Sequence, residues 1–306
     1  MSNVRNHIGN IDVGKIIQND FFELLEKENS GTLTNDDFMK TWTDVVLLPI
    51  ASIEDIVSNS KHTEVGYTKN QAVLYGLLLR IMSLLIDERR LACKQLINYN
   101  MSTVFSRMII ETTVNFIYLL QNQDYIVTFC KLSAKADKEF IHDIYRNRRR
   151  RKIEGGDVDE QYLKYEEGLL ESAKKAVIEA GANFSKDNLK QKSIKEKVKA
   201  VGYERLYSSF GLESHAIHGD WLDISRNYLV KEGDMYYPKF HKKYTDIRKL
   251  NPILTLIYEA LSQFIVSYEG HGIDKEMLQR LQQESDIVND LDLMHYNFVH
   301  GRAIVK

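Results

Sequence analysis

Apolar residues recur every three or four positions along most of the chain, the spacing that gathers them on one face of an α-helix. The most sustained stripe surrounds Asn251 and Pro252, which we interpret as the N-cap and first turn of a core helix. Its apolar positions are Leu250, Ile253, Leu254, Ile257, Leu261, Phe264, Ile265 and Tyr268. Residues 226–230 and 235–237 are short runs around a glycine-containing turn and predict a β-hairpin. The pattern predicts a mainly α fold, an antiparallel helical bundle with one short β-hairpin.

Polar breaks divide the chain into three predicted parts. Residues 1–66 alternate short helical patterns with polar segments and predict an extra N-terminal helical layer. Residues 67–270 contain the long helical patterns and predict the core domain, and residues 271–306 predict a C-terminal helix and tail.

The break at Gly155-Gly156 separates two helical patterns within the core domain. After it, an apolar stripe predicts a helix that ends at Gly181, since glycine readily adopts the left-handed conformation at helix ends. The members of the stripe are Leu163, Leu170, Ala173 and Val177. Residues 185–200 are rich in lysine but interleaved with acidic residues, so we expect a solvated helix there.

The charge balance of the 306-residue chain excludes a strongly basic or acidic protein. Its formal net charge is -2, so any contact with nucleic acid must come from a local patch. The most apolar segment, Ala72–Ile86, is shorter than a membrane span and contains Arg80, and we interpret it as a buried helix. Cys93 and Cys130 lie in apolar helical patterns without zinc-ligand spacing. We therefore expect a cytosolic protein with reduced core cysteines.

Polar residues recur on one narrow stripe of the otherwise apolar helix predicted over Val104–Leu120. They are Arg107, Glu111, Asn115 and Tyr118. Burying an ion costs several kcal/mol unless it is paired and hydrogen-bonded. We therefore expect Arg107 and Glu111 to bind each other and a further group.

A second polar stripe lies on an aromatic helical pattern over residues 203–221. It contains Tyr207, Ser214 and His218, and His215 lies immediately beside it. If the two stripes meet, Arg107 can bind a phosphate or carboxylate while His218, oriented by Glu111 or Ser214, transfers a proton. The candidate catalytic residues are Arg107, Glu111, Ser214 and His218, supported by Asn115, Tyr118, Tyr207 and His215. The alternatives are a structural hydrogen-bond network and ligand binding without turnover.

A basic run suggests a contact with phosphate groups or nucleic acid. Its members are Arg146, Arg148, Arg149, Arg150 and Arg151. The alternative is a solvated helix end, where cations complement the carboxy-terminal dipole. His215 and His218 are spaced to share a metal ion, but no established metal motif accompanies them, so we expect neither a metal nor a cofactor.

The segments Arg107-Met108-Ile109-Ile110-Glu111 and Ser214-His215-Ala216-Ile217-His218-Gly219 resemble the two recurrent blocks of an uncharacterised bacterial family, domain of unknown function 5677. The resemblance covers about residues 70–268 and carries no established activity. The helical pattern of that family is similar to that of HEPN-type ribonucleases, toxin and antiphage proteins that cleave RNA with Arg and His and without a metal. Their Arg and His lie close together on one helix, whereas Arg107 and His218 lie on different predicted helices.

Two functions agree with these patterns. The first is a bacterial cytosolic helical protein with a metal-independent phosphodiesterase site, a toxin-type or phage-defence ribonuclease whose partner is RNA. The second is a non-catalytic helical scaffold or regulatory protein that binds a protein partner. We expect no membrane partner in either case, and a homo-oligomer is compatible with both.

Overall fold

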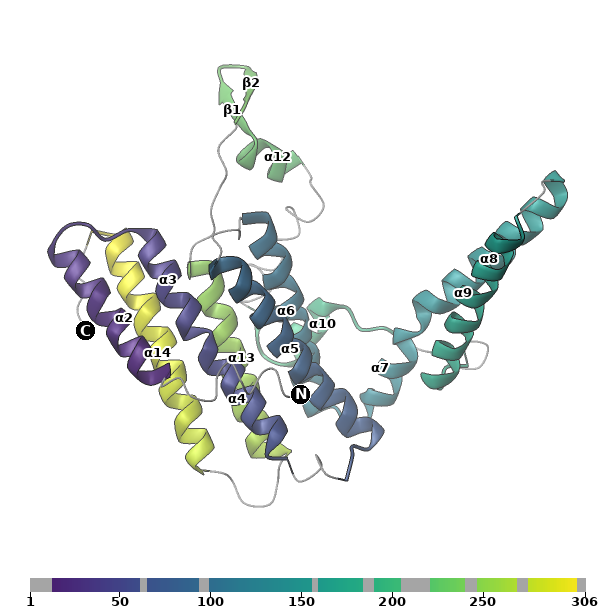
Figure 1. The fold of residues 1–306 in the computed structure, drawn as a ribbon, viewed down its shortest axis with the longest axis horizontal. Coiled ribbons are helices and arrows are strands. Elements are labelled where there is room, and N and C mark those ends of the chain that lie inside the picture. The colour runs from purple at the N-terminus through teal and green to yellow at the C-terminus, as the bar shows by residue number, and fades with distance from the viewer. Residues whose placement is uncertain are drawn as a thin grey trace. The chain divides into compact units, whose positions relative to one another are not determined.

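Helices dominate the fold (Figure 1). The computed structural model describes residues 13–60, 65–93, 99–155, 159–183, 190–204, 221–239, 247–268 and 275–301. In these residues the only strands form one two-stranded antiparallel sheet. The prediction of a mainly α fold with one short hairpin is confirmed.

By their internal contacts the helices divide into two compact units. Met1–Leu120 and Ile194–Lys306 form the first unit, which we call the bundle. Gln121–Ser193 form the second, which we call the arm, and the arm is an insertion within the bundle sequence. The three parts expected from the sequence stay a prediction. In the described residues, α3 and α4 (before residue 66) and α14 (after residue 270) all pack on helices of the segment between them.

The bundle packs its early and late helices together. Its helices are α2 (Val13–Asn29), α3 (Asn35–Val45), α4 (Leu47–Ser58), α5 (Lys69–Cys93), α6 (Tyr99–Gln121), α10 (Ile194–Ala200), α12 (Trp221–Asn227), α13 (Ile247–Ser267) and α14 (Lys275–Val299). α13 packs on α14 and α4, while α3 packs on α2, α5 and α14. The core therefore joins segments that lie more than half the chain apart.

α13 is the central apolar helix of the bundle. Its predicted stripe is buried from Leu250 to Ile265, and the Phe264 ring lies 5.5 Å from both Tyr75 on α5 and Phe116 on α6. The predicted start at Asn251-Pro252 is wrong. Buried Ile247 and Leu250 extend the apolar face towards the N-terminus, so Pro252 lies inside the helix. Asn251 instead donates from Nδ2 to Asp292 Oδ1 on α14 at 3.3 Å.

Two polar networks hold the outer helices of the bundle. In the first, Glu284 Oε2 on α14 accepts a 2.7 Å hydrogen bond from Ser52 Oγ on α4. Glu284 Oε1 accepts a 2.8 Å bond from Arg280 Nε, and Arg280 also pairs with Asp55 on α4. Burial raises the pKa of Glu284, and the bonds from Arg280 and Ser52 oppose this rise. The carboxylate thereby joins the C-terminal helix to α4.

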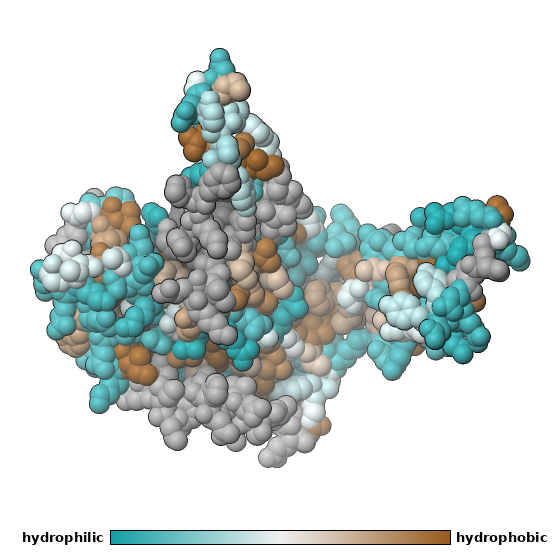
Figure 2. All heavy atoms as spheres, turned by 45° about the horizontal axis from the view of Figure 1, so that its top comes forward, coloured by the Kyte–Doolittle hydropathy of each residue, from teal (hydrophilic) through white to brown (hydrophobic). Residues whose placement is uncertain are grey.

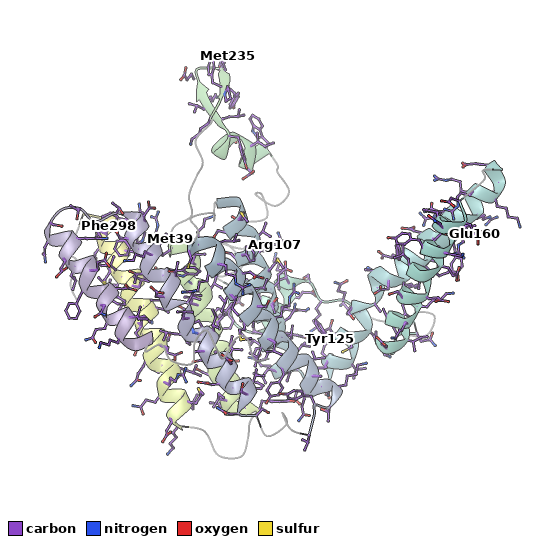
Figure 3. All side chains as sticks on the ribbon, viewed as in Figure 1. Met39, Arg107, Tyr125, Glu160, Met235 and Phe298 are labelled. Carbon is purple, nitrogen blue, oxygen red and sulfur yellow. The ribbon has the colours of Figure 1, made fainter. Side chains whose placement is uncertain are left out.

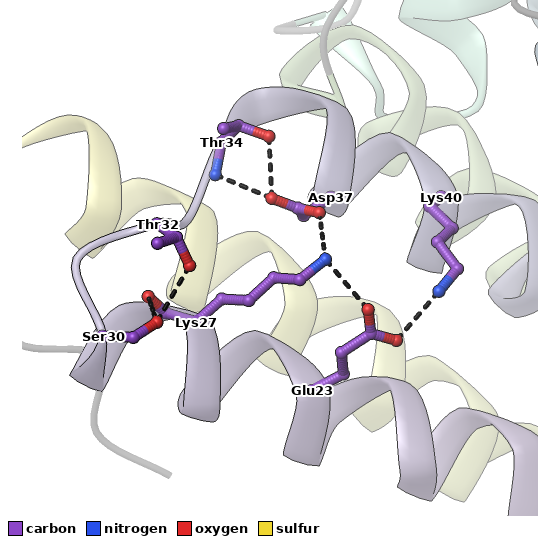
Figure 4. Close-up of polar contacts among 7 residues, drawn as sticks. All are labelled: Glu23, Lys27, Ser30, Thr32, Thr34, Asp37 and Lys40. Carbon is purple, nitrogen blue, oxygen red and sulfur yellow. Dashed lines mark hydrogen bonds and ion pairs between the residues drawn. The ribbon is translucent and has the colours of Figure 1, made fainter.

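The second network joins α2 to α3 (Figure 4). Lys27 Nζ lies 2.9 Å from Glu23 Oε1 and 2.5 Å from Asp37 Oδ1, and Lys40 Nζ lies 2.8 Å from Glu23 Oε2. Asp37 also accepts a 2.9 Å bond from the backbone N–H of Thr34, which completes a capping box at the start of α3. The same side chains therefore cap α3 and hold α2 against it.

The arm contains α7 (Tyr125–Ser133), α8 (Lys135–Glu154) and α9 (Glu160–Glu179), and α8 packs along α9. Gly155 follows α8 with φ of 68°, and Gly181 lies just beyond α9 with φ of 69°, as predicted for Gly181. Leu170 and Ala173 of the predicted stripe are buried, but Leu163 is exposed.

The short elements after the arm confirm the predicted hairpin with shifted limits. β1 (Leu229–Glu232) pairs with β2 (Met235–Pro238) across a turn in which Gly233 has φ of 61°. Arg226, expected in the first strand, belongs to α12. The Trp221 ring at the start of α12 makes an edge contact with Tyr236 at 5.2 Å.

The two cysteines were expected in the core. Cys93 is exposed at the end of α5 and Cys130 is half-buried, so the expectation is wrong for Cys93. By length and composition alone, α5 and α13 could each cross a membrane. This is weak evidence for a membrane protein, since core helices of globular proteins share that property and most of the apolar part of α13 is buried inside the bundle.

Candidate functional site

A polar stripe on α6 forms the first half of the candidate site, and Figure 3 labels Arg107 on this helix. Arg107 Nε donates a hydrogen bond to Glu111 Oε1 at 3.1 Å, the pairing expected one turn apart. The expected burial is only partial, because the Arg107 and Glu111 side chains are 22% and 42% exposed. Water therefore reaches part of the pair.

The dry face of α6 carries hydroxyl groups instead of charges. Ser102 and Thr113 are fully buried, and Thr113 Oγ1 donates to the Ile109 carbonyl at 2.8 Å. The backbone of the same helix can satisfy a buried hydroxyl, whereas a buried ion needs a charged partner or water. This difference explains why the ions lie at the edge of the buried face.

Lys197 on α10 joins the stripe, and the sequence analysis missed it. Its Nζ donates a 2.6 Å hydrogen bond to Asn115 Oδ1, one turn beyond Glu111. Burial lowers the pKa of Lys197, and the charge of Glu111 partly opposes this effect. One signal could have identified it: Lys197 lies three residues after Ile194 and directly before the buried Val198, on the face that packs inward.

Four side chains on and beside α6 combine one carboxylate, one amide and two cations. We call Arg107, Glu111, Asn115 and Lys197 the α6 stripe. Successive positions on α6 are separated by about 6 Å along the helix axis, and Tyr118 is buried at the next turn. Two cationic donors near one carboxylate suit an anion with several oxygens, such as a phosphate group, because each donor can bind a different oxygen.

The predicted second half of the site lies outside the described residues. It comprises Tyr207, Ser214, His215 and His218. Their roles, and the convergence of His218 with Arg107, stay predictions.

The basic run on α8 separates into two groups. Arg148 Nε and Arg151 Nη2 each lie 2.7 Å from an oxygen of Glu166 on α9, whose side chain is only 6% exposed. Arg148 Nη2 also lies 2.7 Å from Glu167 Oε2. The remaining members, Arg146, Arg149 and Arg150, are exposed.

Burial alone would disfavour charge on Glu166, but the hydrogen bonds from Arg148 and Arg151 lower its carboxyl pKa below the usual value. We call these three residues the Glu166 clamp. Elsewhere, the described part of the chain contains no cluster of three or more His, Cys, Asp or Glu side chains arranged to hold a metal ion.

Comparisons with known proteins identify the family but no activity. Among curated proteins and among solved structures, nothing matches the chain. A family match covers residues 71–236, from α5 to β2, and ends before α13, whereas the resemblance was expected to reach residue 268. The expected similarity to HEPN-type proteins stays a prediction. Because the match spans more than half of the chain and includes the α6 stripe, the arm and α12, the chain belongs to the family of unknown function DUF5677.

Proposed function

We propose that this protein is a metal-independent ribonuclease in which the α6 stripe binds the phosphate that is cleaved. The observation that supports the proposal is that Arg107 binds Glu111 and Lys197 binds Asn115, so two cations lie along the same stripe of α6. One cation comes from a helix before the arm in the sequence and the other from a helix after it, yet both lie on one half-exposed stripe. A phosphodiester gains negative charge during cleavage, and neighbouring cations stabilise that charge.

Cleavage in this proposal uses the 2′-hydroxyl of RNA as the nucleophile. The 2′-oxygen attacks the adjacent phosphorus, the bond from phosphorus to the 5′-oxygen breaks, and the products carry a 2′,3′-cyclic phosphate and a 5′-hydroxyl. His218 transfers protons between these oxygens, assisted by Ser214. Arg107, held by Glu111, stabilises the charge on the equatorial oxygens. The lowered pKa of Lys197 makes its ammonium a stronger proton donor than a solvated lysine.

The test is cleavage of a fluorescent single-stranded RNA by the purified full chain in the presence of EDTA. Arg107→Ala and Lys197→Ala should each reduce kcat by about 10²- to 10³-fold, the usual cost of removing one donor to a developing oxyanion. Lys199→Ala is the matched control, because Lys199 is an exposed lysine on the same helix. It should leave the rate unchanged.

Expression of the wild type in bacteria should arrest growth if the ribonuclease is of the toxin type, and the Arg107→Ala/His218→Ala double variant should be harmless. An RNA cleavage rate that is unaffected in this double variant would overturn the proposal.

A second function, a non-catalytic helical binding protein, is favoured by one specific observation. The hydrogen bonds between Arg107 and Glu111 and between Lys197 and Asn115 already satisfy part of the stripe and attach α10 to α6. A purely structural network predicts that Lys197→Ala lowers Tm without changing any RNA-dependent signal. Loss of cleavage at an unchanged Tm would instead favour the ribonuclease.

A further inference from the structure

The Glu166 clamp gives Arg148 and Arg151 a structural role in the arm. Both guanidinium groups point at one buried carboxylate on the neighbouring helix, at 2.7 Å. Withdrawing either arginine to bind a ligand would leave that carboxylate without one of its two cations, at a cost in stability. These arginines are therefore poor candidates for a surface contact.

The other three arginines project from the opposite side of α8. Arg146, Arg149 and Arg150 lie three and four residues apart, so the helical period gathers them on one stripe, which we call the outer face. Their exposure is high: the side chains of Arg146 and Arg150 are 78% and 69% exposed. Figure 2 shows that mostly hydrophilic side chains cover the visible surface of α8 and α9.

Acidic neighbours on the outer face are only loosely bound. Arg146 lies 3.2 Å from Asp143, and Arg150 lies 4.0 Å from Glu154, with both carboxylates more than half exposed. Solvent-exposed ion pairs of this kind contribute little free energy. A ligand that offers phosphate oxygens to a guanidinium in a bidentate geometry can therefore replace them at small cost.

We propose that the outer face of α8 binds the phosphodiester backbone of RNA, an inference that rests on the proposed function for the identity of the ligand. Arg146 and Arg150 are separated by about 6 Å along the helix axis. Since each nucleotide of a strand carries one phosphate, neighbouring arginines can bind different phosphates of the same strand. Arginine suits a phosphate better than lysine does. Its planar guanidinium can donate two hydrogen bonds to two phosphate oxygens, whereas the lysine ammonium acts as a point charge.

Tyr145 adds a stacking surface beside the outer face. It is exposed and lies one turn before Arg149, and its ring also receives Lys174 Nζ from α9 at 5.9 Å from the ring centre. An exposed aromatic ring beside cations suits a nucleotide, whose base can stack while its phosphate is bound. An acidic peptide offers no such base, so the arrangement favours RNA.

The experiment measures the affinity of a labelled single-stranded RNA for the full chain as a function of salt concentration. The Arg107→Ala/His218→Ala background prevents cleavage during the titration. Replacing Arg146, Arg149 and Arg150 by Gln should weaken Kd about 10- to 100-fold at low salt and reduce the slope of log K against log salt by about 2. Arg149→Gln alone should reduce that slope by about 0.7.

The matched control removes the same charge from other exposed positions of the arm: Lys135→Gln, Lys164→Gln and Lys175→Gln. This control should change the slope much less. An unchanged slope in the outer-face variant, with helical content preserved by circular dichroism, overturns the inference. Competition by polyglutamate as strong as that by unlabelled RNA also overturns it. RNA binding that depends on the outer face, together with absence of cleavage by the wild type, would reject the proposed ribonuclease and retain this site.

Discussion

Two arginine–glutamate contacts in this protein differ in how much water reaches the carboxylate. Arg107 and Glu111 lie on one helix, and the Glu111 side chain is 42% exposed. Glu166 lies between two helices, is 6% exposed, and accepts hydrogen bonds from both Arg148 and Arg151. The first contact can open to admit a ligand at small cost, whereas the second must stay closed because an unpaired buried ion is expensive. Burial therefore separates a candidate binding residue from a structural one.

Breaking the Glu166 clamp should have the largest effect on stability. Glu166→Ala leaves Arg148 and Arg151 without their shared carboxylate and removes the only carboxylate that bridges both arginines to α9 in the described residues. We expect a loss of about 2–3 kcal/mol, the cost of deleting one partner of charged hydrogen bonds. Hydrogen exchange of the α8 and α9 amides in the full chain measures it.

Glu167→Gln is the matched control for this experiment, since Glu167 is half exposed and binds only Arg148. Equal exchange rates in the Glu166 and Glu167 variants would contradict the structural role of the clamp.

Asp20 extends the comparison to a buried carboxylate that faces a second carboxylate. Burial, together with the charge of Asp44, raises the pKa of Asp20 on α2 to about 6, while Lys40 opposes the rise and Glu23 adds to it. An acid with a raised folded pKa binds its proton more tightly in the native state than in the unfolded state. Its favourable contribution is therefore greatest below about pH 4 and is lost as pH rises through about 6.

Asp20→Asn should accordingly stabilise the bundle by about 1–2 kcal/mol at pH 8 and have little effect at pH 4. Thermal unfolding of the wild type and the variant across this range measures the difference. If the difference in unfolding free energy between the variant and the wild type were the same at pH 4 and pH 8, the raised pKa of Asp20 would be contradicted.

Glu111→Gln should have the smallest effect on stability, below about 0.5 kcal/mol, because exposed ion pairs one helical turn apart contribute little. The amide keeps the shape of the side chain and loses its charge. RNA affinity should increase slightly, since a carboxylate beside a bound phosphate is repulsive. A large fall in Tm would mean that Arg107 and Glu111 serve the fold in the same way as the clamp.

Periodicity predicted the parts of the fold that depend on one helix at a time. The stripe of α13 and the pairing of Arg107 with Glu111 both follow from the helical repeat, because neighbours on one helix are fixed by their spacing. Contacts between helices were not predictable in this way. Glu166 falls on the inward face of α9 with Leu170 and Ala173, and the two arginines that allow a carboxylate to be buried there come from α8.

Lys197 was missed for a similar reason. The lysine-rich segment 185–200 was interpreted as solvated, and the hydrogen bond that Lys197 donates to Asn115, far away in the sequence, could not be read from that segment. Pro252 was misleading in a different way. Its position suggested that the helix starts there, but the buried side chains of Ile247 and Leu250 place the start of the helix earlier in the sequence.

The hydrogen bond between Lys197 and Asn115 has a consequence for how the length of the arm can vary. Asn115 lies shortly before the arm begins and Lys197 shortly after it ends, so this bond closes a loop of 82 residues. The entropy of closing a flexible loop grows only with the logarithm of its length, about 0.6 kcal/mol for each doubling. Lengthening or shortening the arm by a few helical turns should therefore change the free energy of closing this loop by well under about 1 kcal/mol and leave the bond to the α6 stripe intact.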